Sequence, residues 1–499
     1  MSTAQRYLDH GVWRERTFDE FATAVDQVAT RLRNHAGPGD KVALLAPTSP
    51  EWTICDLAIT RVGAICVPIY PTSTPRQISW ILEDSGAVVA FADRPARITT
   101  LRVLGTEIPD ITPNPGEQPQ PHPDDPATIV YTSGTTGEPK GCVLTHRNIT
   151  SIVAALKQLT DAGPGDVLFA YLPLAHLLTR MLQYFCLETG ATIAYSSGDI
   201  RTVLAELAEA APTYLPSAPA MFEKIHAAVR GLADNKTLVR QAFGGRLKQA
   251  LTGSAPIAPE ILEFFFAAGV PIHEAYGLTE STAVLTANTP AANRFGTVGQ
   301  AVPGVELKIA EDGEVLARSE GVFAGYHNNP AATEETIVDG WLHTGDLGAL
   351  DADGFLTLTG RKNDLVITSA GKNLSPAAIE TDLRRTRWVA GAVLLGDRRP
   401  YAVALLSVDP DDLPTLAAET GINPDVPGWH TDERLRSVIA RDVESVNARY
   451  SPPERIREFA IVPEPFSVES GELTPTLKIR RDVVARRHAA LVDTLYPTP

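Results

Sequence analysis

Residues 131–141 read YTSGTTGEPKG, and this stretch packs hydroxyl side chains, glycines and one lysine together. Glycines let a backbone turn tightly and bring N–H groups close to an anion, and the hydroxyls add further donors. Lys140 adds a positive charge. A flexible turn has a similar composition, but the lysine and the strand-like segments 128–131 and 142–145 disfavour it. The stretch therefore predicts a phosphate-binding loop, with ATP as the expected ligand.

This loop is not a Walker A loop, because the spacing of Gly134, Gly137 and Lys140 does not fit G-x-x-x-x-G-K-[ST] and a strand follows the lysine. Five further motifs occur in order along the chain: LPLAH at 172–176, AYGLTE at 275–280, GWLHTGD at 340–346, GRKND at 360–364 and TPTLK at 474–478. Together with the loop they closely resemble the signatures of the adenylate-forming superfamily. That superfamily includes acyl-CoA synthetases, peptide-synthetase adenylation domains and beetle luciferases.

The resemblance implies a reaction in two steps. A carboxylate attacks the α-phosphate of ATP to give acyl-AMP, and the thiol of coenzyme A then displaces AMP. The expected cofactors are ATP, Mg²⁺ and coenzyme A, and the expected substrate is a small-molecule carboxylic acid. Opposite unit charges 4 Å apart attract by about 4 kcal/mol at an effective dielectric near 20, so a lysine and a metal ion can offset the repulsion between carboxylate and phosphates.

Three residues match the family's catalytic positions. Lys478 would bridge the carboxylate and the α-phosphate, although a lysine in a basic surface cluster is the alternative interpretation. Thr279 would bind the α-phosphate. Glu280 would bind the metal, since Mg²⁺ requires hard oxygen ligands, and its alternative role is a carboxylate at a helix N-terminus.

The resemblance also implies a nucleotide site. Tyr276 would lie against the adenine, Glu274 would contact its amino group, and Asp346 would accept hydrogen bonds from the ribose hydroxyls with help from Arg361. The whole expected set comprises Thr132, Ser133, Gly134, Thr135, Thr136, Gly137, Lys140, Gly253, Ser254, Ala255, Glu274, Ala275, Tyr276, Gly277, Asp346 and Arg361. The alternative interpretations are structural: Tyr276 would be a core residue and Asp346 a turn residue.

His176 marks the expected acyl site, with a purely structural histidine as the alternative. The run 172–178 has no aspartate of the kind that amino-acid-activating relatives use, so we expect a hydrophobic acid: a long-chain fatty acid or a bulky aliphatic or polycyclic acid. Residues 173–224 look most like long-chain acyl-CoA synthetases. The chain is short for that group, so its acyl tunnel is expected to be trimmed.

The resemblance places a hinge at Asn363 and Asp364, and a loop with Gly371 and Lys372 that would face coenzyme A. Four other functions stay open on the sequence. The chain could be an acyl-AMP ligase that loads an acyl carrier protein, a ligase that performs one half-reaction such as CoA transfer from acyl-AMP, a luciferase-type oxidoreductase, or a non-catalytic binder.

Composition narrows the class of protein. The 499 residues carry a net charge of −16, which disfavours a nucleic-acid partner. No apolar run approaches the roughly 20 residues of a transmembrane segment. The first six residues lack a signal-peptide core, and the four cysteines show neither C-x-x-C spacing nor disulfide-rich density. We therefore expect a cytoplasmic protein.

The pattern along the chain predicts an α/β fold. Residues 18–33 have helical periodicity, and residues 41–45 are typical of a buried strand. Short strands and glycine turns between 298 and 359 predict a small β-barrel-like subdomain, in which 351–354 form a hairpin turn and not a calcium loop. We expect a large N-terminal domain of α/β subdomains at 1–361 and a small mobile α+β C-terminal domain at 362–499.

Overall fold

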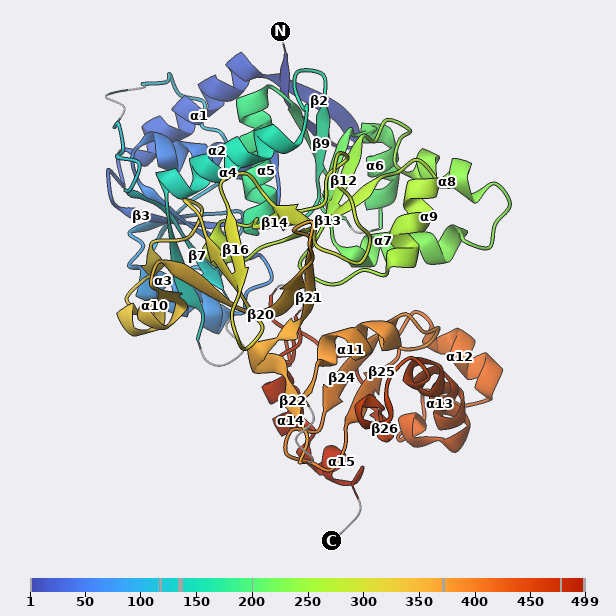
Figure 1. Ribbon diagram of the computed structural model, residues 1–499. Helices are drawn as coiled ribbons and strands as arrows, with labels where there is room; N and C mark the ends of the chain where they lie inside the picture. The colour runs from blue at the N-terminus through green and yellow to red at the C-terminus, as the bar shows by residue number, and fades with distance from the viewer. Residues whose placement is uncertain are drawn as a thin grey trace. The chain divides into compact units, whose positions relative to one another are not determined.

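The computed structural model describes residues 2–114, 116, 119–132, 138–199, 201–369, 373–475 and 478–496. These residues form two compact units (Figure 1). The first contains residues up to 344 together with 348–358, and the second contains 345–347 together with residues from 359 onward. None of the helices in these ranges combines the length and the apolar character that crossing a membrane requires.

A nine-stranded sheet of the first unit carries the residues that are predicted to contact the adenine. Its order is β15-β14-β13-β12-β11-β9-β10-β1-β2, and the strands from β13 to β1 run parallel. The strands are β15 (Gln300–Ala301), β14 (Thr286–Ala287), β13 (Ile272–Tyr276), β12 (Gln249–Thr252), β11 (Tyr214–Ser217), β9 (Val167–Ala170), β10 (Thr192–Tyr195), β1 (Thr3–Asp9) and β2 (Val12–Thr17).

A seven-stranded sheet carries the predicted phosphate loop, in the order β18-β8-β7-β4-β3-β5-β6. Its strands are β18 (Gly325–Tyr326), β8 (Lys140–Thr145), β7 (Pro126–Thr132), β4 (Ile65–Ile69), β3 (Lys41–Leu45), β5 (Val89–Ala92) and β6 (Arg102–Leu104). The buried strand expected at 41–45 is thereby confirmed. All five residues of β4 are buried, as expected for a strand covered on both faces.

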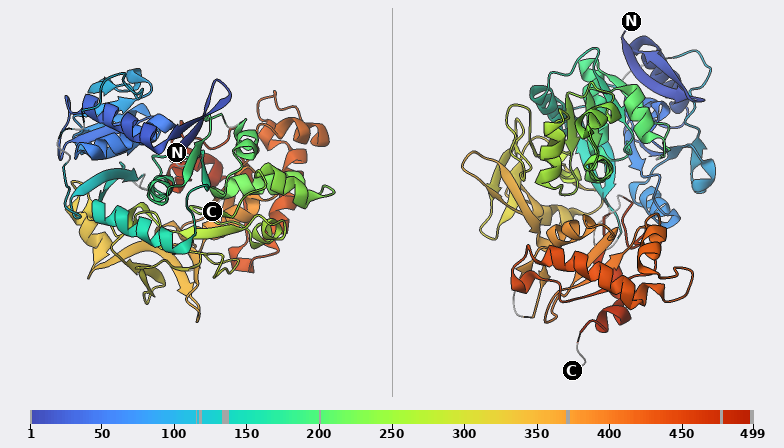
Figure 2. Two further views of the ribbon diagram at one scale, coloured as in Figure 1. Left: turned by 90° about the horizontal axis from the view of Figure 1, so that it is seen from above. Right: turned by 90° about the vertical axis from the view of Figure 1, so that its right-hand side faces the viewer.

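Helices cover these sheets with their apolar faces. The helix expected at 18–33 is confirmed as α1 (Phe18–Leu32), which begins at a capping box formed by Thr17 and Glu20. Helix α4 (His146–Leu159) begins at a second capping box and packs against α5 (Leu177–Thr189) (Figure 1). The other helices of this unit are α2 (Pro50–Arg61), α3 (Pro75–Ser85), α6 (Val203–Ala210), α7 (Pro219–Val229), α8 (Asn235–Ala242), α9 (Pro259–Ala267) and α10 (Pro330–Thr336), with short 3₁₀ turns η1 (Pro95–Arg97) and η2 (Thr279–Ser281). Figures 1 and 2 show α7, α8 and α9 grouped beside β12 and β13.

The small sheet expected between 298 and 359 is also present. Its order is β16-β17-β20-β19, with β21 paired to β20. The strands are β16 (Glu306–Ile309), β17 (Glu314–Arg318), β19 (Ile337–Val338), β20 (Trp341–Leu350) and β21 (Leu356–Arg361). Asp351 Oδ1 accepts hydrogen bonds from the backbone N–H groups of Asp353 (3.0 Å) and Phe355 (2.9 Å), which confirms the predicted hairpin turn.

The second unit has its own apolar core around a three-stranded sheet, β24-β25-β26. In that sheet β24 (Gly391–Leu395) and β25 (Val403–Ser407) are antiparallel, and β26 (Glu458–Ile461) runs parallel to β25. Helices α11 (Pro376–Arg384) and α13 (Glu433–Asn447) pack together. The remaining elements are β22 (Val366–Ile367), β23 (Asn373–Leu374), α12 (Leu413–Thr420), α14 (Arg481–Arg487), α15 (Ala489–Asp493) and the 3₁₀ turns η3 (Lys362–Asp364), η4 (Trp429–Thr431) and η5 (Pro452–Glu454).

Candidate active site

The β7–β8 hairpin holds the two described ends of the predicted phosphate loop. Thr132 at the end of β7 pairs with Lys140 at the start of β8. Gly141 is required for packing, because a Cβ there would lie 2.7 Å from a methyl carbon of Ile129. The central loop residues lie outside the described residues; they are Ser133, Gly134, Thr135, Thr136 and Gly137.

Tyr326 contacts both Glu280, the predicted metal ligand, and Lys140, the predicted phosphate-binding lysine. Its hydroxyl donates a hydrogen bond to Glu280 Oε1 at 2.7 Å, and Lys140 Nζ lies 5.2 Å from the centre of its ring. Burial raises the pKa of the Tyr326 phenol well above its ordinary value, and the nearby Glu280 raises it further, so the phenol stays a donor at neutral pH. The sequence analysis missed Tyr326, since the two-residue strand β18 has no periodicity that could mark it.

The Thr279–Ser281 turn presents Glu280 directly after β13. Gly277 allows this turn, because a Cβ at this position would lie 2.2 Å from the carbonyl oxygen of Ala283. The Ser281 hydroxyl accepts a hydrogen bond from the Leu278 N–H at 2.9 Å, and the Glu280 carbonyl accepts one from the Phe323 N–H at 2.9 Å. Thr279 and Glu280 are therefore held on a backbone fixed from both sides.

Two side chains of the predicted nucleotide set lie on one face of β13. Glu274 and Tyr276 are two residues apart, so the alternation of a strand directs them to the same side, and both are buried. Within the described residues, Glu274 Oε2 has no hydrogen-bond partner. Burial raises the pKa of the Glu274 carboxyl to about 7. An unpaired buried oxygen is costly unless a donor arrives, so this carboxyl is suited to bind a hydrogen-bond donor such as an amino group.

The predicted adenine wall follows β12. A Cβ at Gly253 would lie 2.7 Å from the carbonyl oxygen of Ala275, so only glycine fits there. Ser254 has a positive φ of 69°, a backbone conformation that costs free energy in a non-glycine residue and that clusters at functional sites. Ala255 follows it as an exposed residue. The end of β12 is thus placed beside the end of β13.

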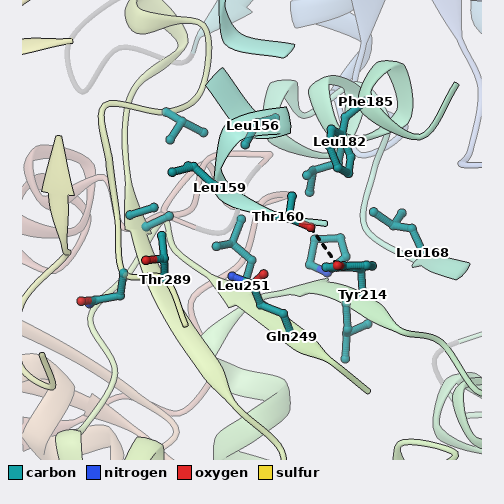
Figure 3. Close-up of a pocket in the computed structure, with 16 residues that line it drawn as sticks. Leu156, Leu159, Thr160, Leu168, Leu182, Phe185, Tyr214, Gln249, Leu251 and Thr289 are labelled. Carbon is teal, nitrogen blue, oxygen red and sulfur yellow. Dashed lines mark hydrogen bonds between the residues drawn. The ribbon is translucent and has the colours of Figure 1, made fainter. Parts of the chain in front are cut away.

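An apolar pocket opens beside these strands (Figure 3). Ala275 forms part of its wall. Its cavity volume is about 60 Å³. The lining residues are Leu156, Leu159, Thr160, Leu168, Leu182, Phe185, Tyr214, Leu215, Pro216, Gln249, Leu251, Ala275, Val284, Ala287, Asn288 and Thr289. These residues come from α4, α5 and five neighbouring strand regions, which is why no single motif could reveal the pocket.

His176 does not line this pocket. It is the N-cap residue of α5, and its backbone N–H donates to the Pro173 carbonyl at 3.0 Å. Helix α5 itself supplies Leu182 and Phe185 to the pocket wall. The predicted acyl role of His176 stays a prediction, while the helix that it begins does contribute to an apolar cavity.

The second unit contains the other predicted residues. Arg361 Nε donates to Asp346 Oδ1 at 2.7 Å, and Asp346 is buried. Asn363 and Asp364 lie in the 3₁₀ turn that follows β21. Gly371 and Lys372, predicted to face coenzyme A, lie outside the described residues.

Lys478 is an exposed residue on a short backbone hairpin. Its carbonyl accepts a hydrogen bond from the Thr474 N–H at 2.8 Å, and its own N–H donates to the Thr474 hydroxyl at 3.0 Å. The Arg480 N–H donates to the Glu472 carbonyl at 2.8 Å, which closes the stem. The hairpin fixes the backbone from which the lysine projects and leaves its long side chain exposed.

The residues present fit a Mg²⁺ ion that is carried by a nucleotide. In the described part of the chain, no group of three or more His, Cys, Asp or Glu side chains could hold a metal ion. Mg²⁺ is usually bound through one or two carboxylates together with substrate phosphates and water, and does not need an all-protein cage. Glu280 can supply such a carboxylate, with Tyr326 orienting it.

Comparison with known proteins agrees with this arrangement. The AMP-binding enzyme model matches residues 2–327, and the AMP-binding enzyme C-terminal domain model matches residues 363–498. The long-chain-fatty-acid–CoA ligase FadD15 of Mycobacterium tuberculosis is 35% identical over 570 aligned positions, which cover 99% of this chain and 94% of that protein. Because 570 positions exceed the 499 residues here, the relative carries insertions that this chain lacks. The long-chain-fatty-acid–CoA ligase 5 of Rattus norvegicus is 28% identical, covering 91% of this chain and 80% of that protein.

Solved structures show the same fold. The anthranilate CoA ligase AuaEII in complex with anthranoyl-AMP superposes with a TM-score of 0.80 at 25% identity, covering 99% of this chain and 95% of that one. The O-succinylbenzoate CoA synthetase MenE from Bacillus subtilis, in complex with ATP and magnesium, gives 0.79 at 23% identity, covering 96% of both chains. The predicted family, α/β fold and enzyme class are confirmed. The chain therefore belongs to the AMP-binding enzyme family, among its adenylate-forming acyl-CoA ligases.

Proposed function

We propose that this enzyme activates a long-chain fatty acid as acyl-AMP and transfers the acyl group to coenzyme A. The apolar pocket is the observation that supports a hydrophobic acid as the substrate. Its wall includes Ala275, which directly precedes Tyr276, the residue proposed to contact the adenine. An acid whose apolar tail fills this pocket would present its carboxylate near the end of β13. The names of the relatives support a fatty acid over the bulky aliphatic or polycyclic acids.

In the first step, a carboxylate oxygen forms a bond to the α-phosphorus of ATP, and the bond to the pyrophosphate oxygen breaks. Lys478 would bridge the two anions, Thr279 would donate to the α-phosphate, and Lys140 would bind the outer phosphates with the residues from Thr132 to Gly137. A Mg²⁺ ion held by Glu280 supplies positive charge at the phosphates. Tyr326 is the residue that orients Glu280 for this task.

The predicted nucleotide residues would hold the adenine and the ribose of ATP. Tyr276 and the wall of Gly253, Ser254 and Ala255 would contact the adenine. Glu274, with an unpaired buried oxygen, would accept a hydrogen bond from the adenine amino group. Asp346 would bind the ribose hydroxyls, with Arg361 fixing its orientation through the 2.7 Å hydrogen bond.

In the second step, the sulfur of coenzyme A forms a bond to the acyl carbon, AMP leaves, and the thiol proton passes to solvent. We infer that Asn363 and Asp364 act as the hinge and that Gly371 and Lys372 border the path of the pantetheine arm. The division into domains at 1–361 and 362–499 belongs to the same proposal. It is supported by the second compact unit, which contains the residues from 359 onward in addition to 345–347, and by the C-terminal domain match at 363–498.

Coenzyme A is the proposed acceptor, and an acyl carrier protein is the rival. The relatives are named CoA ligases, which favours coenzyme A. We also propose a cytoplasmic location, which the four buried free cysteines support because a reducing compartment keeps thiols unpaired.

The test uses the purified chain with ATP, Mg²⁺ and hexadecanoic acid, with and without coenzyme A. Pyrophosphate and thioester are followed separately. We expect pyrophosphate in both samples and hexadecanoyl-CoA only where coenzyme A is present. Pyrophosphate without any thioester would favour the carrier-protein function, and no pyrophosphate with any fatty acid would overturn the proposal.

A further inference from the structure

The far end of the apolar pocket is closed by polar side chains at the surface of the first unit. Thr160 Oγ1 donates a hydrogen bond to the Tyr214 hydroxyl at 2.8 Å (Figure 3). The Tyr214 hydroxyl in turn donates to Asp161 Oδ1 at 2.9 Å. Thr160 and Tyr214 are half-buried and line the pocket, whereas Asp161 is exposed. Tyr214 therefore stands between the apolar cavity and solvent.

The strand register gives the distance from this end to the nucleotide end. Tyr214 on β11 pairs with Gln249 on β12, and Ala250 pairs with Ile272 on β13. Ala275 thus lies four residues further along the sheet than the level of Tyr214. At roughly 3.3 Å per residue this is about 13 Å. An extended hexadecanoyl chain is longer than this span, and the cavity is narrow at about 60 Å³.

We propose that Tyr214 is a gate at the distal end of the acyl pocket, which is closed by Thr160 and Asp161 and swings aside to let the tail of a long acyl chain reach the surface. The inference rests on the proposed function and adds the residue that sets the chain-length range. Acids whose tails end before Tyr214 leave the gate closed, whereas longer acids require it to open.

The bonds that close the gate are weak enough for a substrate to break. One of them ends on Asp161, whose side chain is 86% exposed, so water can replace the phenol as its partner. The net contribution of two such hydrogen bonds is comparable to the burial of a few methylene groups. Burial raises the pKa of Tyr214 to about 12, so the phenol keeps its proton and closes the gate across the neutral pH range.

The residues around Tyr214 allow its side chain to rotate without rearrangement of the neighbouring ion pairs. Thr160 is the C-cap residue of α4, and Asp161 follows it in the loop that leads to β9. Lys248 Nζ lies 5.9 Å from the centre of the Tyr214 ring and forms ion pairs with Asp166 at 3.0 Å and with Asp161 at 3.9 Å. A rotation of the Tyr214 side chain breaks the two gate bonds and leaves these ion pairs in place.

The test measures kcat/KM for octanoic, dodecanoic, hexadecanoic and eicosanoic acids in the full chain. We expect Tyr214→Trp to lower the value for hexadecanoic acid about tenfold or more, because a larger side chain blocks the exit, while octanoic acid stays within about twofold. Tyr214→Ala removes the gate. We expect the ratio of kcat/KM for eicosanoic acid to kcat/KM for octanoic acid to rise about tenfold in this variant. Tyr7→Trp on β1, which does not line the pocket, is the control and should keep the wild-type profile.

Activity towards octanoic acid reports that each variant is folded. Two results would contradict the gate and leave the ligase function intact. In the first, both Tyr214 variants keep the wild-type ratios of kcat/KM among the four acids. In the second, Tyr214→Trp lowers kcat/KM for octanoic and hexadecanoic acids equally. If the wild type turns over no fatty acid, the proposed function fails and the gate fails with it.

Discussion

At the scale of single residues, Lys478 has the most specific proposed role. Replacing it by alanine removes one positive charge from the step in which two anions meet, so we expect adenylation to fall about 10²–10³-fold. Transfer from synthetic acyl-AMP to coenzyme A should stay near the wild-type rate, because no carboxylate then approaches a phosphate. Arg486→Ala removes an exposed cation that pairs with Asp482 on the same helix and serves as the matched control. Wild-type adenylation in Lys478→Ala would remove this lysine from the mechanism.

Glu274 gives a second prediction, which concerns stability. Its pKa rises from 4.5 to about 7 on folding because of burial. The folded state therefore holds a proton that the unfolded state has lost between these values, and this group's contribution to stability falls as pH rises through the window, by about 3 kcal/mol. Glu274→Gln cannot lose a proton.

We therefore expect the urea-unfolding free energy of Glu274→Gln to exceed that of the wild type near pH 8 and to approach it near pH 4.5, the ordinary value for this carboxyl. Taking the difference between the two proteins removes the other titrating groups. A difference that is the same at both pH values would contradict the raised pKa.

At the scale of elements, the two-residue strand β18 brings Tyr326 to Glu280. Tyr326→Phe keeps the ring near Lys140 and removes the hydroxyl that donates to the carboxylate. We expect the Mg²⁺ concentration required for half-maximal pyrophosphate release to rise about 10–100-fold, the usual cost of losing a residue that orients a metal ligand. Tyr450→Phe, which removes a hydrogen bond to Asp382 in the second unit, is the control. An unchanged Mg²⁺ requirement in Tyr326→Phe would refute this orienting role.

Helices α2 and α5 are joined by a buried ion pair. Arg180 Nη2 and Nε donate to the two oxygens of Asp56 at 2.6 and 3.0 Å, and Nη1 donates to Thr128 of β7 at 2.8 Å. Asp56→Ala leaves a buried guanidinium without its counterion, so we expect a loss of about 3–5 kcal/mol in unfolding free energy.

The double variant Asp56→Leu with Arg180→Met removes both charges and should lose less than Asp56→Ala alone. Urea unfolding of the three proteins measures this order. A double variant less stable than Asp56→Ala would show that the charges themselves, and not their pairing, stabilise the helices.

At the scale of the whole molecule, the fold followed from local patterns. Motif order indicated the family, and periodicity placed α1 and β3 where the structure has them. The strand-like segments 128–131 and 142–145 lie within β7 and β8. No sequence pattern predicted the contacts between residues that are far apart in the chain. Tyr326 and Glu280 are 46 positions apart, and Asp56 and Arg180 are 124 apart. The pocket gate likewise depends on strand register, which a sequence pattern does not specify when a strand is four residues long.

The central claim is that a carboxylate is activated by forming a bond to the α-phosphorus of ATP. Hexadecanoic acid labelled with oxygen-18 in both carboxyl oxygens tests it most directly, by mass spectrometry of the products after reaction with ATP, Mg²⁺ and coenzyme A. The account predicts one labelled oxygen in AMP and none in pyrophosphate, because the oxygen that attacks phosphorus leaves with AMP when the thiol takes the acyl group. Label in inorganic phosphate or pyrophosphate, or AMP without label, would contradict it.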